Sequence, residues 1–222
     1  MRPLLLFRLA VLALLLAAAG ARGEKLLRYA FPIAETGFDP AQISDVYSMV
    51  LVANIFESPL TYDYLARPAQ LRPATAAALP EVSADYRRWV FRIRPGIYFT
   101  DHPAFHGRPR ELTAADYVYA IKRYYDPRWK SPSLSFFETA QLLGLSELRR
   151  AALATRKPFD YDTEVPGLRT LDRYTFVVQT AVPAPHLAAL FADTRITAAV
   201  AREVVESDPE HIMEHQIGRA HV

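Results

Sequence analysis

Apolar residues recur at the spacing of an α-helix in two stretches of the chain. The first stretch predicts a helix that Ser44 can cap. Its apolar positions are Val46, Met49, Val50, Ala53 and Phe56. The second stretch begins with Thr113 and Asp116, which resemble a capping box with Asp in place of the usual Glu or Gln. Its apolar positions are Tyr117, Ala120, Ile121 and Tyr124.

Shorter apolar runs predict strands. Residues 89–94 alternate as Trp, Val, Phe, Arg, Ile and Arg, which is typical of a half-buried strand. Pro95 and Gly96 then predict a turn, with residues 97–100 returning as a hairpin partner. The other predicted strands are residues 25–31, 60–64, 165–168 and 175–180, and the other predicted helices are residues 134–154, 186–192 and 200–205. The expected class is mixed α/β, with a loop at residues 35–40.

Composition excludes several kinds of chemistry. The chain of 222 residues has no cysteine, which excludes disulfides, thiolate zinc sites and a cysteine nucleophile. None of its 8 glycines falls in a phosphate-binding GxGxxG or GxxxxGK motif, so no nucleotide cofactor is expected. The formal charge is +2. Without residues 1–23 and 217–222, the remaining 22 basic and 24 acidic residues give −2, so no nucleic-acid partner is expected.

Both ends of the chain differ from its middle. Residues 1–23 join Arg2 and Arg8 to an apolar run at residues 9–19 and then to small residues. This order predicts a cleavable signal peptide and a periplasmic location, with an uncleaved anchor as the alternative. Residues 217–222 match the translation of a common sequencing adapter, so we expect a non-native tail there. A genuine polar tail is the alternative.

Short motifs follow one another in a characteristic order between these ends. They are RYAF at 28–31, FDP at 38–40, NIFESPL at 54–60, LRP at 71–73, WVFRIRPGIYF at 89–99 and LTAADYVYA at 112–120. This order, in which a strand is followed by an RPG turn, a second strand and a capped helix, resembles that of the family 5 extracellular solute-binding proteins. These are the oligopeptide and dipeptide receptors of ABC importers. The resemblance covers residues 24–216. The loop at residues 101–112 is longer than the usual turn of the family, so the resemblance does not identify the solute.

The resemblance implies a type II periplasmic binding protein fold, of which this chain would be the N-terminal portion. Residues 24–65 and 170–216 would belong to the first of two lobes, and residues 66–169 would form an extra small lobe. The residues implied to contact the solute are Glu35, Thr36, Gly37 and Phe38. The implied activity is capture of a peptide or another small solute by a monomer, followed by delivery to a membrane permease. No catalysis, cofactor or metal is implied.

Two histidine patterns offer alternatives. His211, Glu214 and His215 form an H-x-x-E-H pattern, which on a helix would suit a secreted zinc hydrolase. His102 and His106 are four residues apart, but Pro103 between them indicates a solvated loop rather than a metal site. A binding protein that serves as a chaperone or signalling receptor without its own permease is a third possibility.

Overall fold

The computed structural model describes Leu26 and residues 28–214. The predicted signal peptide at residues 1–23, the predicted tail at residues 217–222 and His215 lie outside the described residues. The chain divides into two compact units, Met1–Pro32 and Ile33–Val222. In the first unit, the described part of residues 25–31 has no regular secondary structure, so the strand predicted there is wrong for that part. An extended run becomes a strand only when a neighbour hydrogen-bonds to it.

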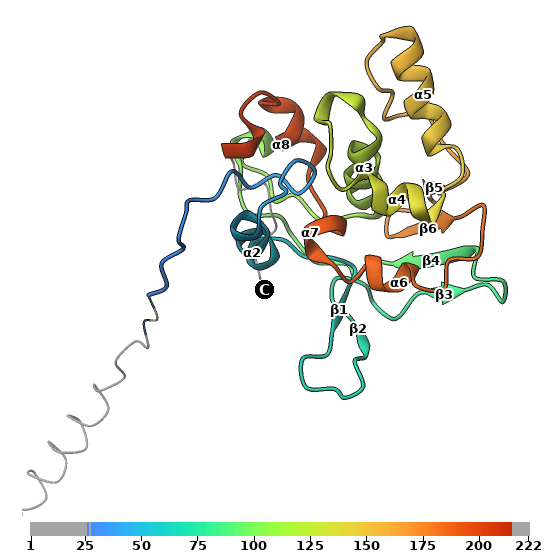
Figure 1. Cartoon of the computed structure of the whole chain (residues 1–222), viewed down its shortest axis with the longest axis horizontal. Helices are drawn as coiled ribbons and strands as arrows, with labels where there is room; N and C mark the ends of the chain where they lie inside the picture. Colours follow the sequence, from blue (N-terminus) through green and yellow to red (C-terminus); the bar gives the residue numbers. More distant parts are fainter. Residues whose placement is uncertain (1–25, 27, 215–222) are drawn as a thin grey trace, which may run out of the picture. The chain divides into compact units, whose positions relative to one another are not determined.

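A four-stranded antiparallel sheet forms the framework of the second unit (Figure 1). Its strands, in spatial order, are β3 (Glu81–Val82), β4 (Arg88–Arg92), β6 (Thr175–Gln179) and β5 (Leu168–Thr170). The strand predicted at residues 175–180 is therefore confirmed. The strand predicted at residues 165–168 instead begins at Leu168, and Val165 only forms an isolated bridge to it.

The two faces of the sheet are both covered at its centre. Phe91 and Phe176 lie opposite each other and stack at 4.9 Å between ring centroids. Val90 points to the other face and is also buried, opposite Val177 of β6 and beside Glu81 of β3. Strand β4 is therefore buried on both faces at its centre, and the half-buried strand predicted from the alternation is wrong in this respect.

The segment after the turn that follows β4 does not pair as the sequence predicts. Pro95 and Gly96 form the predicted turn, with Gly96 at φ 80°. Residues 97–100 do not return along β4, and Tyr98 forms a bridge to Glu111 instead. The predicted hairpin partner is wrong because β4 already bonds to β3 on one side and to β6 on the other.

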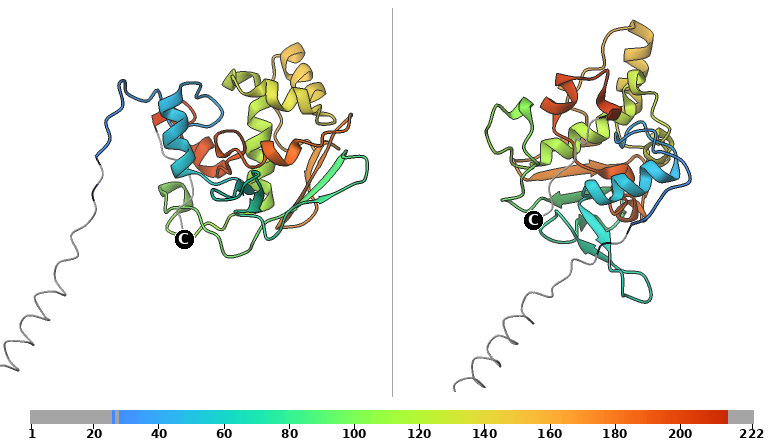
Figure 2. Two further views of the ribbon diagram at one scale, coloured as in Figure 1. Left: turned by 60° about the horizontal axis from the view of Figure 1, so that its bottom comes forward. Right: turned by 90° about the vertical axis from the view of Figure 1, so that its left-hand side faces the viewer.

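Helix α3 (Ala114–Tyr125) packs against β5 and β6 (Figure 2). The predicted capping box is confirmed, because the Asp116 carboxylate accepts hydrogen bonds from the Thr113 N–H at 2.7 Å and from the Thr113 hydroxyl at 2.9 Å. The predicted apolar stripe is also confirmed. Its four members, all buried, are Tyr117, Ala120, Ile121 and Tyr124.

Two helices replace the single helix predicted over residues 134–154. These are α4 (Leu134–Ala140) and α5 (Leu145–Thr155). Between them, Gln141 and Gly144 adopt φ values of 53° and 86°, which end one helix and begin the next. The Leu143 N–H donates to the Gln179 carbonyl at 3.1 Å, so this junction is bound to the end of β6. Because the two paired segments are far apart in the sequence, the local spacing of apolar residues does not reveal this break in the helix.

Helix α2 (Val46–Ile55) lies where a helix was predicted, but its cap and its buried face differ from the prediction. The N-cap is Asp45 rather than Ser44. Val52 is fully buried, whereas Val46 is 68% exposed. Since almost every residue of this helix is apolar, apolar spacing does not single out the face that packs inward.

The remaining elements are short. They are β1 (Leu60–Tyr62), β2 (Leu71–Pro73), α6 (Leu187–Leu190), α7 (Thr194–Thr197), α8 (Arg202–Ser207) and the 3-10 turns η1 (Pro103–Phe105), η2 (Pro127–Trp129) and η3 (Ile212–Glu214). The predicted strand at residues 60–64 and the predicted helix at residues 186–192 are thus confirmed in shorter form, and the helix predicted at residues 200–205 is confirmed two residues later in the chain. No helix within the described residues is long and apolar enough to cross a membrane.

A buried ion pair ties the segment before α2 to α3. Asp39 and Arg123 have side chains that are 0% and 1% exposed. The two terminal nitrogens of Arg123 each donate to a different Asp39 oxygen, both at 2.7 Å. The Arg123 guanidinium also lies 4.4 Å from the centroid of the Trp129 ring. Because both charges are removed from water, either one alone would be strongly unfavourable.

We expect Arg123→Met to lower the free energy of unfolding by about 3–5 kcal/mol, because it leaves the Asp39 carboxylate buried without a counter-charge. The double variant Arg123→Met/Asp39→Leu should recover most of this loss. Urea denaturation measures both values. Arg156→Met, at an exposed arginine, is the control and should change stability by about 0.5 kcal/mol or less. A single variant as stable as the wild type would show that the pair does not hold the fold together.

Candidate ligand-binding loop

One irregular segment directly before α2 holds the four predicted solute-contacting residues, Glu35, Thr36, Gly37 and Phe38. Glu35 and Thr36 are exposed, Gly37 is buried and Phe38 is half-buried. The Thr36 N–H donates to the Ser48 hydroxyl at 2.9 Å, and the Phe38 N–H donates to the Met213 carbonyl at 2.8 Å. The backbone of this segment, called the ligand loop below, is therefore held by α2 and by η3.

Gly37 is where the ligand loop and η3 approach each other most tightly. A Cβ atom at this position would lie 2.5 Å from Met213 Cε and 2.8 Å from the Met213 carbonyl oxygen. Both distances are too short for any side chain. The close approach that this glycine permits is therefore to another part of the same chain.

The hydrogen-bonding groups of the ligand loop are used unevenly. The N–H groups of Thr36, Gly37 and Phe38 are all engaged, by Ser48 or by Met213. The carbonyl oxygens of residues 35–38 accept no hydrogen bond from any other residue that the structure describes. The exposed part of the loop, Glu35 and Thr36, thus combines backbone acceptors that no described residue uses with a carboxylate, which suits a ligand with N–H donors and a positive charge.

The Asp45 carboxylate joins the ligand loop to α2. It accepts hydrogen bonds from the Ser48 N–H at 2.8 Å and from the Thr36 hydroxyl at 2.5 Å. Slight burial acts to raise the pKa of Asp45, but the hydrogen bonds from Ser48 and Thr36 outweigh it and lower the pKa to about 2. The carboxylate is therefore ionised at neutral pH, when it caps the helix and positions Thr36.

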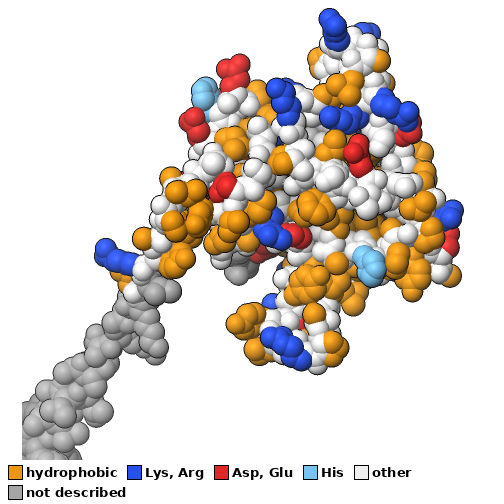
Figure 3. All heavy atoms as spheres, in the orientation of Figure 1, with side chains coloured by type: hydrophobic (Ala, Val, Ile, Leu, Met, Phe, Trp, Pro, Cys, Tyr) orange, Lys and Arg blue, Asp and Glu red, His pale blue; other side chains and the backbone are white. Residues whose placement is uncertain are grey.

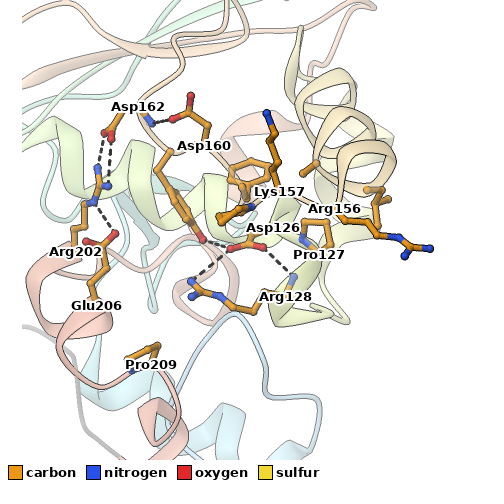
Figure 4. Close-up of a pocket in the computed structure, with 15 residues that line it drawn as sticks. Asp126, Pro127, Arg128, Arg156, Lys157, Asp160, Asp162, Arg202, Glu206 and Pro209 are labelled. Atoms are coloured by element: carbon orange, nitrogen blue, oxygen red, sulfur yellow. Dashed lines mark hydrogen bonds and ion pairs between the residues drawn. The ribbon is translucent and has the colours of Figure 1, made fainter.

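A separate cavity of about 650 Å³ lies beside α5 and α8 (Figure 4). Buried Asp126 accepts a hydrogen bond from the Tyr161 hydroxyl at 2.7 Å, and Arg202 pairs with both Asp162 and Glu206. Sequence reasoning did not single out these residues, because charged residues in a loop look the same whether they line a cavity or face solvent. Most charged side chains that line the cavity form ion pairs with other residues of the chain. None of the lining residues belongs to the ligand loop.

The arrangement around His211 does not support the zinc-site alternative. His211 and Glu214 lie at the short turn η3 rather than on an α-helix, and His215 lies outside the described residues. The Asp208 carboxylate accepts a hydrogen bond from His211 Nδ1 at 2.9 Å, which raises the pKa of the imidazole and engages that nitrogen within the chain. Within residues 28–214 and Leu26, no three His, Asp or Glu side chains gather as metal ligands.

The second histidine pair has a structural role. The Nδ1 atom of His102 accepts a hydrogen bond from the Ala104 N–H at 3.2 Å and so caps η1. His106 ends the same turn in a left-handed conformation, at φ 52°. The two side chains follow a turn rather than a helix, so their spacing does not place them as a ligand pair.

The Asp45 cap should give a pH-dependent contribution to stability. We expect Asp45→Ala to lower the free energy of unfolding by about 1 kcal/mol at neutral pH, because the helix loses its cap. The folded-state pKa lies below the ordinary value of 3.8, so the stabilisation is complete above that value and is lost as the pH falls toward about 2. The difference in free energy of unfolding between wild type and variant should therefore decrease as the pH falls through this range, and denaturation curves at several pH values measure it. Asp101→Ala, at an exposed loop position, is the control. A difference that does not change with pH would contradict the proposed role of the charge.

Comparison with known proteins identifies the family of this chain. The sequence profile of the bacterial extracellular solute-binding proteins, family 5 Middle, matches residues 70–219. Di/tripeptide-binding protein 4 of Pseudomonas aeruginosa is 31% identical over 157 residues, which cover 67% of this chain and 28% of that protein. Periplasmic oligopeptide-binding protein OppA of Salmonella typhimurium is 27% identical over 148 residues, which cover 67% and 24%. The chain thus spans about a quarter of the length of these relatives.

Solved structures share the architecture. Haemophilus influenzae OppA in complex with RPPGFSPFR superposes with a TM-score of 0.63 over 81% of this chain and 31% of that one, at 24% identity. Burkholderia pseudomallei OppA gives a TM-score of 0.61 over 82% and 31%, also at 24% identity. The mixed α/β unit is therefore part of the type II periplasmic binding protein fold, as the motifs implied. On the profile match and the sequence relatives, the chain belongs to the bacterial extracellular solute-binding proteins of family 5.

Proposed function

We propose that this chain is part of a periplasmic binding protein that captures a peptide and delivers it to an ABC permease. The relatives are named as binding proteins for oligopeptides and for di- and tripeptides, which supports capture without catalysis. In the part of the chain that the structure describes, the observation that carries the proposal is the ligand loop. The N–H groups of Thr36, Gly37 and Phe38 are bound internally, and no described residue donates to its carbonyl oxygens.

A peptide fits this pattern because its backbone carries N–H donors at regular intervals. An extended peptide beside residues 35–38 would donate to these carbonyl oxygens in the way that an added strand does. The exposed Glu35 carboxylate would pair with a cationic group of the ligand. Since α2 and η3 hold the loop, little ordering of its backbone would accompany binding.

The proposal includes the wider organisation that the family resemblance implies. In this division residues 24–65 and 170–216 contribute to one lobe and residues 66–169 form the small lobe, with the sheet continuing across the boundary through the pairing of β4 with β6. A second large lobe closes over the solute. Ligand binding shifts the open form toward the closed form, which the permease then recognises. Residues 1–23 act as the export signal, and the mature protein works as a monomer. The periplasmic names of the relatives support this location.

Titration of the purified full chain with a tripeptide, followed by calorimetry, tests the proposal. We expect Glu35→Gln to weaken binding about tenfold, the loss typical of one hydrogen bond to a charged group. Glu147→Gln, at an exposed position on α5, is the matched control and should bind as the wild type does.

A second solute makes the experiment selective. One relative is named a probable deoxycholate-binding periplasmic protein, so deoxycholate is the competing ligand. Binding of deoxycholate with no binding of peptides would overturn the peptide assignment. Equal peptide affinity in Glu35→Gln and wild type would remove Glu35 from the binding site.

A further inference from the structure

A two-stranded hairpin projects from the rest of the second unit (Figure 1). Strands β1 and β2 pair Leu60 with Pro73 and Tyr62 with Leu71, and the Asp63 N–H continues the ladder to the Gln70 carbonyl at 2.8 Å. The hairpin tip, residues 63–70, therefore lies at the far end of a hydrogen-bonded ribbon.

The hairpin tip is ordered by its own side chains. The Asp63 carboxylate accepts a hydrogen bond from the Leu65 N–H at 3.0 Å. The Arg67 guanidinium donates to the Ala66 carbonyl at 2.7 Å and to the Tyr64 carbonyl at 3.2 Å. These bonds fix the backbone of the turn without covering its apolar side chains.

The apolar side chains at this end are unusually exposed. Tyr64 and Leu65 are 84% and 82% exposed, and Tyr62 on the adjoining strand is 47% exposed. Figure 3 shows hydrophobic side chains on the projecting part of the molecule, with basic side chains among them. A protruding cluster of this kind differs from single apolar residues scattered over a surface, and it marks an interaction site.

The charge of the hairpin favours an anionic partner. Residues 60–73 contain Arg67, Arg72 and one acidic residue, Asp63, which gives a net charge of +1. Neither arginine forms an ion pair with a carboxylate among the described residues. Tyrosine prefers the interface between lipid headgroups and acyl chains, leucine prefers the acyl region, and arginine pairs with phosphate. The hairpin tip presents these three residue types together on a convex end.

We propose that the hairpin tip binds the surface of an anionic lipid bilayer, with Tyr64 and Leu65 entering the interfacial region and Arg67 facing lipid phosphates. The contact is weak and reversible, because so few side chains enter the membrane. It would hold an exported binding protein close to the membrane surface. The proposal does not depend on solute capture, since the hairpin tip and the ligand loop share no residues.

Co-sedimentation of the full chain with vesicles tests this proposal. Vesicles of phosphatidylcholine mixed with phosphatidylglycerol should bind the protein, and phosphatidylcholine alone should bind it less. We expect Leu65→Ser to weaken the partition coefficient about tenfold through lost apolar burial. Arg67→Gln should weaken it about fivefold, and added salt should weaken it in the wild type.

Two control variants isolate the hairpin. Leu153→Ser removes an exposed leucine from α5, and Arg156→Gln removes an exposed arginine that follows α5. Both should bind vesicles as the wild type does, and thermal denaturation should show that no variant has lost its fold. Equal binding by Leu65→Ser and Leu153→Ser would overturn the proposal. So would absence of vesicle binding together with cross-linking of the hairpin tip to a membrane protein.

Discussion

The hydrogen-bonded ion pair between Asp39 and Arg123 is the constraint on which the rest of the structure depends. Asp39 directly follows the ligand loop, whereas Arg123 lies in the last turn of α3, the helix that packs on the sheet. Both charges are buried, so neither can leave the other without a large desolvation penalty. The pair therefore fixes the segment before α2 relative to the sheet, although 84 positions separate the two residues.

Two elements besides this ion pair hold the ligand loop in place, the N-terminus of α2 and the turn η3. Asp45 and Ser48 of the α2 N-terminus bind Thr36, and Met213 binds Phe38. These contacts use N–H groups and leave the carbonyl oxygens as acceptors. A preorganised row of acceptors costs little entropy to occupy, which is the property that a solute receptor requires. The structure thus connects a buried electrostatic interaction to the loop that we propose contacts the solute.

Local signals in the sequence were sufficient where the structure depends on local chemistry. The Thr113–Asp116 capping box and the Pro95-Gly96 turn are predictable because neighbouring residues determine them. The partner of residues 97–100 is not, because it depends on which strands already occupy the edges of β4. The buried face of α2 was also missed, since a helix that is apolar all round has no face marked by its pattern.

The irregular backbone of residues 35–38 was predictable from the sequence, but the contacts that hold it were not. The family motifs placed Glu35–Phe38 in a loop, yet nothing in those four residues identifies Ser48, Asp45 or Met213 as their partners. Asp39 belongs to the FDP motif and Arg123 lies three residues after the LTAADYVYA motif, but their pairing requires the tertiary fold. Side chains from distant segments build the support of this loop, and single-sequence patterns carry no record of such contacts.

Amide hydrogen exchange in the ligand loop tests the central claim most directly. The measurement compares the exchange rates of the Thr36 and Phe38 amides with that of Val177 in β6, in wild type and in Arg123→Met. If the ion pair positions the loop, the Thr36 and Phe38 amides should exchange faster in the variant by a larger factor than the Val177 amide. An equal increase at all three amides would mean that the pair contributes only to global stability and does not hold the ligand loop.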